Sequence, residues 1–249
     1  MVTLELNLIA AHLEGLEETI IHRLIDRAQF AANPTAYRPG RSGFEGAGDR
    51  SLFDMRLRYQ EEMDAEFGRF QVPEERPFHR DLPEPRRIVQ LPQTPLRVTN
   101  LDLVNVTPEI VAGYKRFLPR LCRPRNGVKD DGQYGSSVEH DVLAIQAIAR
   151  RVHFGALYVA ESKYSAAPDE LRDPITERDE AAVLAKITRP EVEEQILRRV
   201  AEKVDYVQAT INETVRRRID PEVVLHFYSD LIIPLTKEGE LRYLFARER

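Results

Sequence analysis

Apolar residues recur along much of this chain at the three- and four-residue steps of an α-helix. Between residues 4 and 30 each step is three or four residues, so the apolar side chains fall on one helical stripe. The stripe consists of Leu6, Ile9, Leu13, Leu16, Ile20, Leu24 and Ala28. This pattern predicts a long first helix over about 4–30.

Prolines and glycines mark the segments that follow. Residues 33–49 contain two prolines and four glycines, which predicts a loop. A second helix is expected from about 51 to 70. Residues 72–100 are rich in proline and are predicted to be irregular.

Several later segments begin with residues that favour helix starts. Thr107 and Asp220 each precede a proline, which places a capping side chain before a proline at the first helical position. Ser136 is followed three residues later by Glu139, the pattern of a capping box, and apolar residues keep a heptad rhythm to about residue 164. A further helix is predicted from Arg189 to about residue 217, where three consecutive arginines suit the negative end of its dipole.

The short apolar runs lack the alternation of a β-strand, so the predicted class is all-α. Long helices with extensive apolar stripes pack against one another and can bury surface between subunits. We therefore expect a multi-helix bundle forming a single domain over residues 1–249, and a homodimer.

Composition describes an ordinary soluble protein. The chain has 249 residues, of which 42% are apolar and 31% charged, and its formal net charge of −5 argues against nucleic acid as a partner. Cys122 is the only cysteine, which excludes an internal disulfide framework and fits a reducing compartment. With no basic leader and no apolar run near the roughly 20 residues that cross a bilayer, we expect a cytoplasmic protein that does not bind a membrane.

Four segments carry a resemblance to a known family. They are VEHDVLAIQAIARRVHFG at 138–155 with VAESKY at 159–164, EETII at 17–21, EVEEQIL at 191–197 and IPLTKEGELRYL at 233–244. Together they resemble the eukaryotic-type chorismate mutases of yeast and plants, and they occur in family order across nearly the whole chain, which chance rarely produces. The resemblance implies the all-α chorismate mutase type II fold, a homodimer, and conversion of chorismate to prephenate in phenylalanine and tyrosine biosynthesis without a cofactor.

The implied reaction is a pericyclic rearrangement, so catalysis rests on holding a compact conformer and stabilising charge at the breaking ether bond. Chorismate carries two carboxylates, which arginine forks bind well. By family position Arg151 binds a substrate carboxylate, while Lys163 and a protonated Glu240 donate to the ether oxygen. The resemblance also implies that Glu193 receives the substrate hydroxyl. Thr236 lies four residues before Glu240 on the same helical face, so its hydroxyl would help to orient a bound carboxylate. Without the resemblance, each charged residue would be interpreted as a solvated helix charge.

Two positions and one spacing depart from the family pattern. Ala10 stands where the family has a carboxylate-binding arginine, and Arg189 stands where relatives carry a small amide. Arg189 either supplies the missing contact or fills the pocket and pairs with Glu193. Arg151 and Lys163 are 12 residues apart instead of 11, which turns them about 120° from each other on a regular helix.

The altered spacing predicts a one-residue π-type bulge between Gly155 and Val159, which would restore the common face. The alternative is a catalytically silent or repurposed relative that keeps the fold.

The resemblance also implies an effector site for tyrosine or tryptophan. Arg69, Gly135 and Ser136 match family positions at this site, whereas Gly68 replaces a second arginine. Backbone amides at the start of the helix near residue 136 would hold an effector carboxylate. His153, beside the expected carboxylate-binding arginine, is predicted to be a packed structural histidine, and the spacing of the six histidines predicts no metal site.

Overall fold

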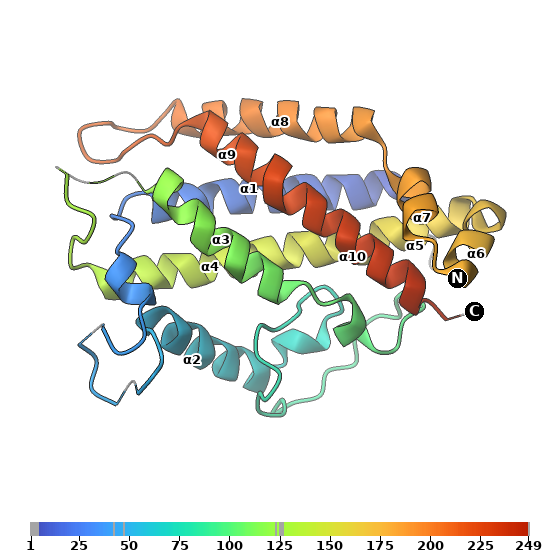
Figure 1. Ribbon diagram of the computed structural model, residues 1–249, viewed down its shortest axis with the longest axis horizontal. Coiled ribbons are helices and arrows are strands. Elements are labelled where there is room, and N and C mark those ends of the chain that lie inside the picture. The colour runs from blue at the N-terminus through green and yellow to red at the C-terminus, as the bar shows by residue number, and fades with distance from the viewer. Residues whose placement is uncertain (1–4, 42, 47, 123, 125–126, 249) are drawn as a thin grey trace.

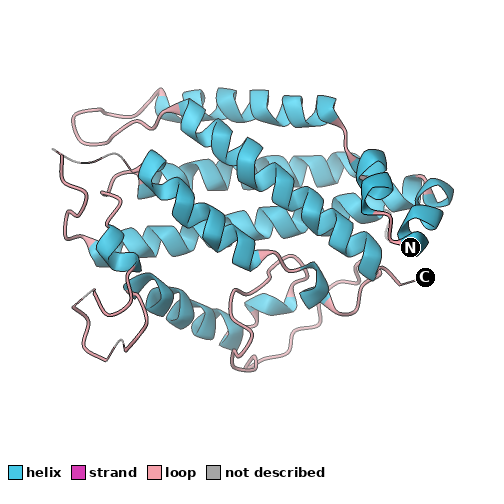
Figure 2. Ribbon diagram, in the orientation of Figure 1, coloured by secondary structure: helices cyan, strands magenta, loops and turns pink. Residues whose placement is uncertain are grey.

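The computed structural model describes residues 5–41, 43–46, 48–122, 124 and 127–248. Within these ranges the chain forms helices joined by loops and no β-strand, which confirms the predicted all-α class (Figure 2). The α-helices are α1 (Leu6–Arg27), α2 (Leu52–Glu66), α3 (Thr107–Leu121), α4 (Tyr134–Phe154), α5 (Ala160–Ala166), α6 (Pro168–Glu177), α7 (Glu180–Ile187), α8 (Pro190–Gln208), α9 (Pro221–Phe227) and α10 (Ile233–Ala246). Short 3₁₀ turns are η1 (Pro34–Tyr37), η2 (Arg69–Gln71) and η3 (Leu101–Val104).

The long helix that contains α4 and α5 forms the centre of the bundle (Figure 1). It packs against α1, α2 and α3, and α10 crosses it diagonally. Ile145 and Ile148 of α4 are fully buried. By length and composition alone Tyr134–Ala166 would be long enough to cross a membrane, but 67% of its most apolar window is buried inside the fold. Its apolar side chains therefore pack against neighbouring helices.

A π-helical turn, η4 (Gly155–Val159), joins α4 to α5 without interrupting the helix. This confirms the bulge that the 12-residue spacing predicts. The extra residue offsets the additional 100° of rotation, so residues 151 and 163 return to one face of the helix.

Helix α10 lies unusually close to this π turn. A Cβ atom on Gly155 would stand 2.8 Å from Cγ2 of Thr236, and a Cβ atom on Gly239 would stand 2.6 Å from Cβ of Ala156. Two glycines, one on each side of the contact, thus allow α10 to approach α4 and α5. A second π turn, η5 (Tyr228–Ile232), leads into α10 and was not predicted.

A buried ion pair fixes the end of α1. Arg27 Nε donates to Asp141 Oδ1 of α4 at 2.6 Å, and the hydroxyl of Tyr114 in α3 donates to the same oxygen at 2.8 Å. Arg27 Nη1 also donates to the carbonyl of Ala31, beyond the end of α1. Because all of these partners are buried, the network holds three helices in one arrangement.

Two predicted helix starts differ from the structure. Helix α4 begins at Tyr134, so the capping box at Ser136 is wrong; the neighbouring Ser137 hydroxyl donates to the Tyr134 carbonyl inside the first turn. Thr107 is the first residue of α3, and its hydroxyl donates to the carbonyl of Pro77 instead of capping the helix. In contrast, Asp220 caps α9 through the amide of Glu222, as predicted.

The helix predicted to reach residue 217 ends nine residues earlier, at Gln208. The side chain of Gln208 bonds both the amide and the carbonyl of Ile219, which closes the intervening segment into a loop. The three arginines at 216–218 therefore lie outside α8. Helices α6 and α7 were not predicted.

Candidate active site

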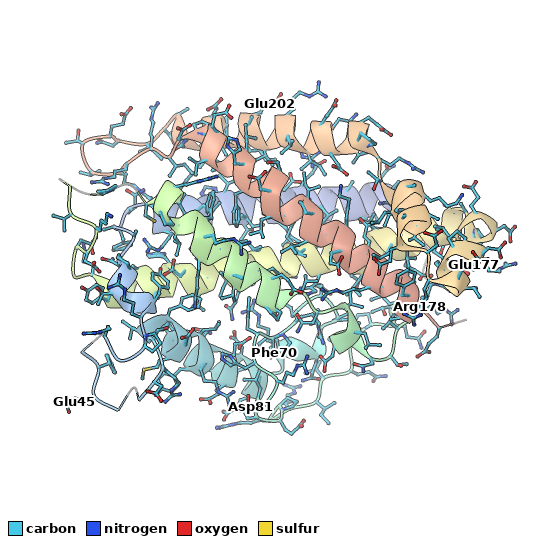
Figure 3. All side chains as sticks on the ribbon, viewed as in Figure 1. Glu45, Phe70, Asp81, Glu177, Arg178 and Glu202 are labelled. Atoms are coloured by element: carbon cyan, nitrogen blue, oxygen red, sulfur yellow. The ribbon has the colours of Figure 1, made fainter. Side chains whose placement is uncertain are left out.

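Most charged side chains of the described residues lie on the surface of the bundle, at least partly in contact with water. The charged residues labelled in Figure 3 are exposed and lie at its edges: Glu45, Asp81, Glu177, Arg178 and Glu202. Against this background the buried charges are exceptional, because an ionised group removed from water needs a partner or a ligand. Three of them, Glu17, Arg151 and Glu240, belong to one cluster between α1, the central helix and α10.

The central helix and α10 bring together four of the residues singled out from the sequence. Arg151 Nη1 donates to Thr236 Oγ1 at 3.0 Å. Lys163 Nζ donates to Glu240 Oε2 at 2.7 Å and to the carbonyl of Ile187, at the end of α7, also at 2.7 Å. The π turn makes this possible, since Arg151 and Lys163 both face α10.

Arg151 is only 2% exposed, and its guanidinium lies next to a buried carboxylate of α1. Its Nη2 lies 3.7 Å from Oε1 of Glu17, a fully buried residue of α1. Arg199 of α8 binds the same carboxylate through two hydrogen bonds of 2.9 and 2.8 Å, and Lys203 Nζ lies 3.6 Å from it. The Arg151 guanidinium is therefore oriented before any ligand arrives.

Two buried donors beside this network have no hydrogen-bond partner among the described residues. They are Nε of Arg151 and the hydroxyl of Tyr228. Tyr228 is fully buried, and the charges of Arg151 and Glu17 act on it. An unpaired buried donor costs free energy, so these two groups are suited to an acceptor oxygen on a ligand. The sequence did not indicate Tyr228, which lies eight residues before Thr236 and is the first residue of the π turn η5.

Glu240 has the environment expected of a carboxyl that keeps its proton. It is 4% exposed, and burial raises its pKa above the ordinary value of 4.5. The charges of Lys163, Arg151 and Lys237 oppose this shift without cancelling it. The upward direction agrees with the sequence-based expectation of a protonated donor.

Glu193 of α8 reaches the site through a partner that the sequence interpretation did not name. Its Oε1 lies 3.0 Å from Nζ of Lys237 on α10, and both side chains are 29% exposed. In the sequence, the one indication that Lys237 belongs near the cluster is its position directly after Thr236. Arg189 does not join the cluster: it is exposed, and Nη1 donates to the carbonyls of Lys186 and Thr188.

Ala10 lies exposed on α1 and brings no charge to the cluster. His153 is fully buried; one ring nitrogen lies 2.7 Å from the Ala149 carbonyl and the other accepts from the Val106 amide. Burial lowers the pKa of His153 to about 3, so the ring is neutral. This agrees with its predicted structural role.

The residues expected at an effector site lie apart within one chain. Gly135 and Ser136 are in the first turn of α4. Arg69 pairs with Asp64 of α2 at 2.9 Å, and Asp64 accepts from Gln146 at 2.8 Å. Gln146 is ten residues beyond Ser136, or about 15 Å along the helix. The effector role of these three residues stays a prediction.

A cavity of about 440 Å³ lies elsewhere, at the loop that joins α8 to α9. Its lining includes four arginines at 120 and 216–218, and none of the clustered residues described above. Two of its guanidiniums are paired, Arg216 with Asp26 and Arg218 with Glu213. The cavity therefore contains none of the buried donors that meet between the central helix and α10.

Comparison with known proteins agrees with the geometry. No family model matches the sequence. The chorismate mutase of Trichoderma parareesei is 35% identical, over 98% of this chain and 93% of that protein. A chorismate mutase from Candida albicans solved with L-Trp superposes with a TM-score of 0.88 at 29% identity, covering 98% of this chain and 92% of that one. The chloroplast enzyme of Zea mays gives 0.82 at 34% identity, covering 97% and 94%. The chain therefore belongs to the chorismate mutase family of fungi and plants.

Proposed function

We propose that the protein converts chorismate to prephenate at the cluster of Arg151, Lys163, Thr236 and Glu240. The observation that carries the proposal is the meeting of Lys163 and Glu240 at 2.7 Å beside a buried arginine. Two donors directed at one point are what a developing oxyanion needs. No nucleophile is required, because the ether C–O bond breaks while a C–C bond forms in the same molecule.

In this mechanism the Arg151 fork binds one substrate carboxylate, with Thr236 beside it. The ether oxygen takes a position between Lys163 and Glu240 and replaces their mutual contact. Both groups then donate to it as negative charge develops in the transition state, so they bind the transition state more tightly than the substrate. Glu193 accepts the substrate hydroxyl.

The direct test is to follow the loss of chorismate absorbance with purified protein from pH 5 to 8. The rate should rise toward acid, because only protonated Glu240 donates to the ether oxygen. Since burial raises the pKa of Glu240, the rate should begin to fall at a pH above the ordinary carboxyl value of 4.5. Above that pKa the rate should fall about tenfold for each pH unit.

A Glu240→Gln variant is the matched control, since an amide donates at every pH. Its profile should be flat, with activity at pH 8 equal to or above that of the unchanged protein. If the variant kept the acid-dependent profile, Glu240 would not be the titrating donor. Absence of a rate above background at every pH would instead favour a catalytically silent relative.

We also propose that the protein is a homodimer, in keeping with its family. Support comes from α2 and the residue that caps its end, because Tyr59, Met63 and Phe67 are 54%, 44% and 75% exposed and follow one another at four-residue steps. Such a stripe on a helix surface favours a protein partner. A second copy of the chain should cover this stripe, so Met63→Glu should halve the mass measured by sedimentation equilibrium. Leu8→Glu, at an exposed position of α1, should leave the mass unchanged. A single-chain mass for the unchanged protein would contradict the proposal.

A further inference from the structure

The cluster offers one buried guanidinium to a substrate with two carboxylates. A carboxylate that leaves water without a cationic partner is strongly disfavoured, so a second cation is required. Most neighbouring cations are engaged elsewhere. Arg199 and Lys203 bind Glu17, and the exposed guanidinium of Arg189 bonds carbonyls of its own loop.

Lys237 meets the requirement. It lies on α10 between two site residues, one position after Thr236 and three before Glu240, and its charge acts on Glu240. Within the described part of the chain it forms an ion pair with Glu193 alone, at 3.0 Å, and both side chains remain in partial contact with water. A half-exposed ion pair contributes little to stability, so Lys237 can exchange it for a substrate oxygen at small cost.

We propose that Lys237 binds the second carboxylate of the substrate. Glu193 holds the lysine in place before the substrate binds, and then accepts the substrate hydroxyl. This inference rests on the proposed mutase function and adds to it a residue that decides specificity for a diacid. Lys237 and Arg151 then bind opposite ends of one small ligand, and α10 carries contacts to both.

The test uses a dicarboxylate transition-state analogue and its two monomethyl esters as probes of Lys237→Met, which removes the charge and keeps an apolar stem. The variant should bind the diacid about 10- to 150-fold more weakly than the unchanged protein, the effect of losing one charge-assisted hydrogen bond. It should bind one of the two monoesters as tightly as the unchanged protein does. Arg151→Ala should show the reverse preference between the two esters.

Three further variants separate binding from a structural role. Lys237→Arg should restore diacid binding, and Lys115→Met, which alters an ion pair with Asp54 on another face, should leave it unchanged. Glu193→Gln should keep the preference for the diacid; if it reproduced the defect of Lys237→Met, the lysine would only position Glu193. Equal affinity of Lys237→Met and unchanged protein for the diacid would overturn the inference.

Failure of the inference and failure of the proposed function give different results. If the unchanged protein neither converts chorismate nor binds the diacid, both are wrong. If it does both and Lys237→Met behaves identically, the mutase function stands and only the role of Lys237 is lost.

Discussion

Replacing Arg151 with alanine is expected to lower kcat/KM for chorismate by about 10²- to 10⁴-fold. The substitution removes a two-bond fork to a desolvated carboxylate, and each charge-assisted bond contributes about 1.5–3 kcal/mol. Arg151→Lys should recover part of the loss, because it restores the charge without the fork. Steady-state kinetics on the three proteins measures the effect.

The neighbouring Arg150 supplies a matched control. Its side chain is 40% exposed and lies 3.3 Å from Glu75, away from the cluster. Arg150→Ala should therefore stay within a few-fold of the unchanged protein. Thermal unfolding would show that Arg151→Ala still folds, since Glu17 keeps Arg199 and Lys203 as partners. Activity of Arg151→Ala within threefold of the unchanged protein would exclude Arg151 from substrate binding.

Replacing Lys163 with alanine is expected to lower kcat by about 10²- to 10³-fold, the usual cost of removing one donor aimed at a developing oxyanion. The remaining activity should also extend to higher pH. Lys163 lowers the pKa of Glu240, so its removal raises that pKa and keeps the carboxyl protonated over a wider range. A pH profile of kcat measures both effects.

Lys186→Ala is the control for this substitution. Lys186 precedes the carbonyl that Lys163 binds, but its own ammonium pairs with Glu170 on the surface at 3.6 Å. We expect kcat of this variant to equal that of the unchanged protein at every pH. An unshifted profile for Lys163→Ala would show that Lys163 and Glu240 do not interact during the reaction.

The central helix shows which structural features can be predicted from the local sequence pattern alone. Its apolar stripe follows from the 3.6-residue period, and the mismatch between residues 151 and 163 predicts a π turn, because rotation along one helix depends only on the number of residues between two positions. Helix ends are less determined. The capping box at Ser136 is wrong because α4 begins two residues earlier, at Tyr134. The predicted end near residue 217 is wrong because the Gln208 side chain bonds the backbone of Ile219 and closes a loop there.

The sequence by itself thus determined the helical class, the family and the pair of cations on the central helix. Only the tertiary structure decided which charges meet. Glu240 and Lys163 are 77 residues apart, and Glu17 and Arg199 are 182 apart. The sequence placed Arg189 at the site, yet in the structure Lys237 of α10 pairs with Glu193 of α8 and Arg189 bonds carbonyls of its own loop. Periodicity describes one helix at a time, whereas burial, pKa and ion pairing depend on which faces pack together.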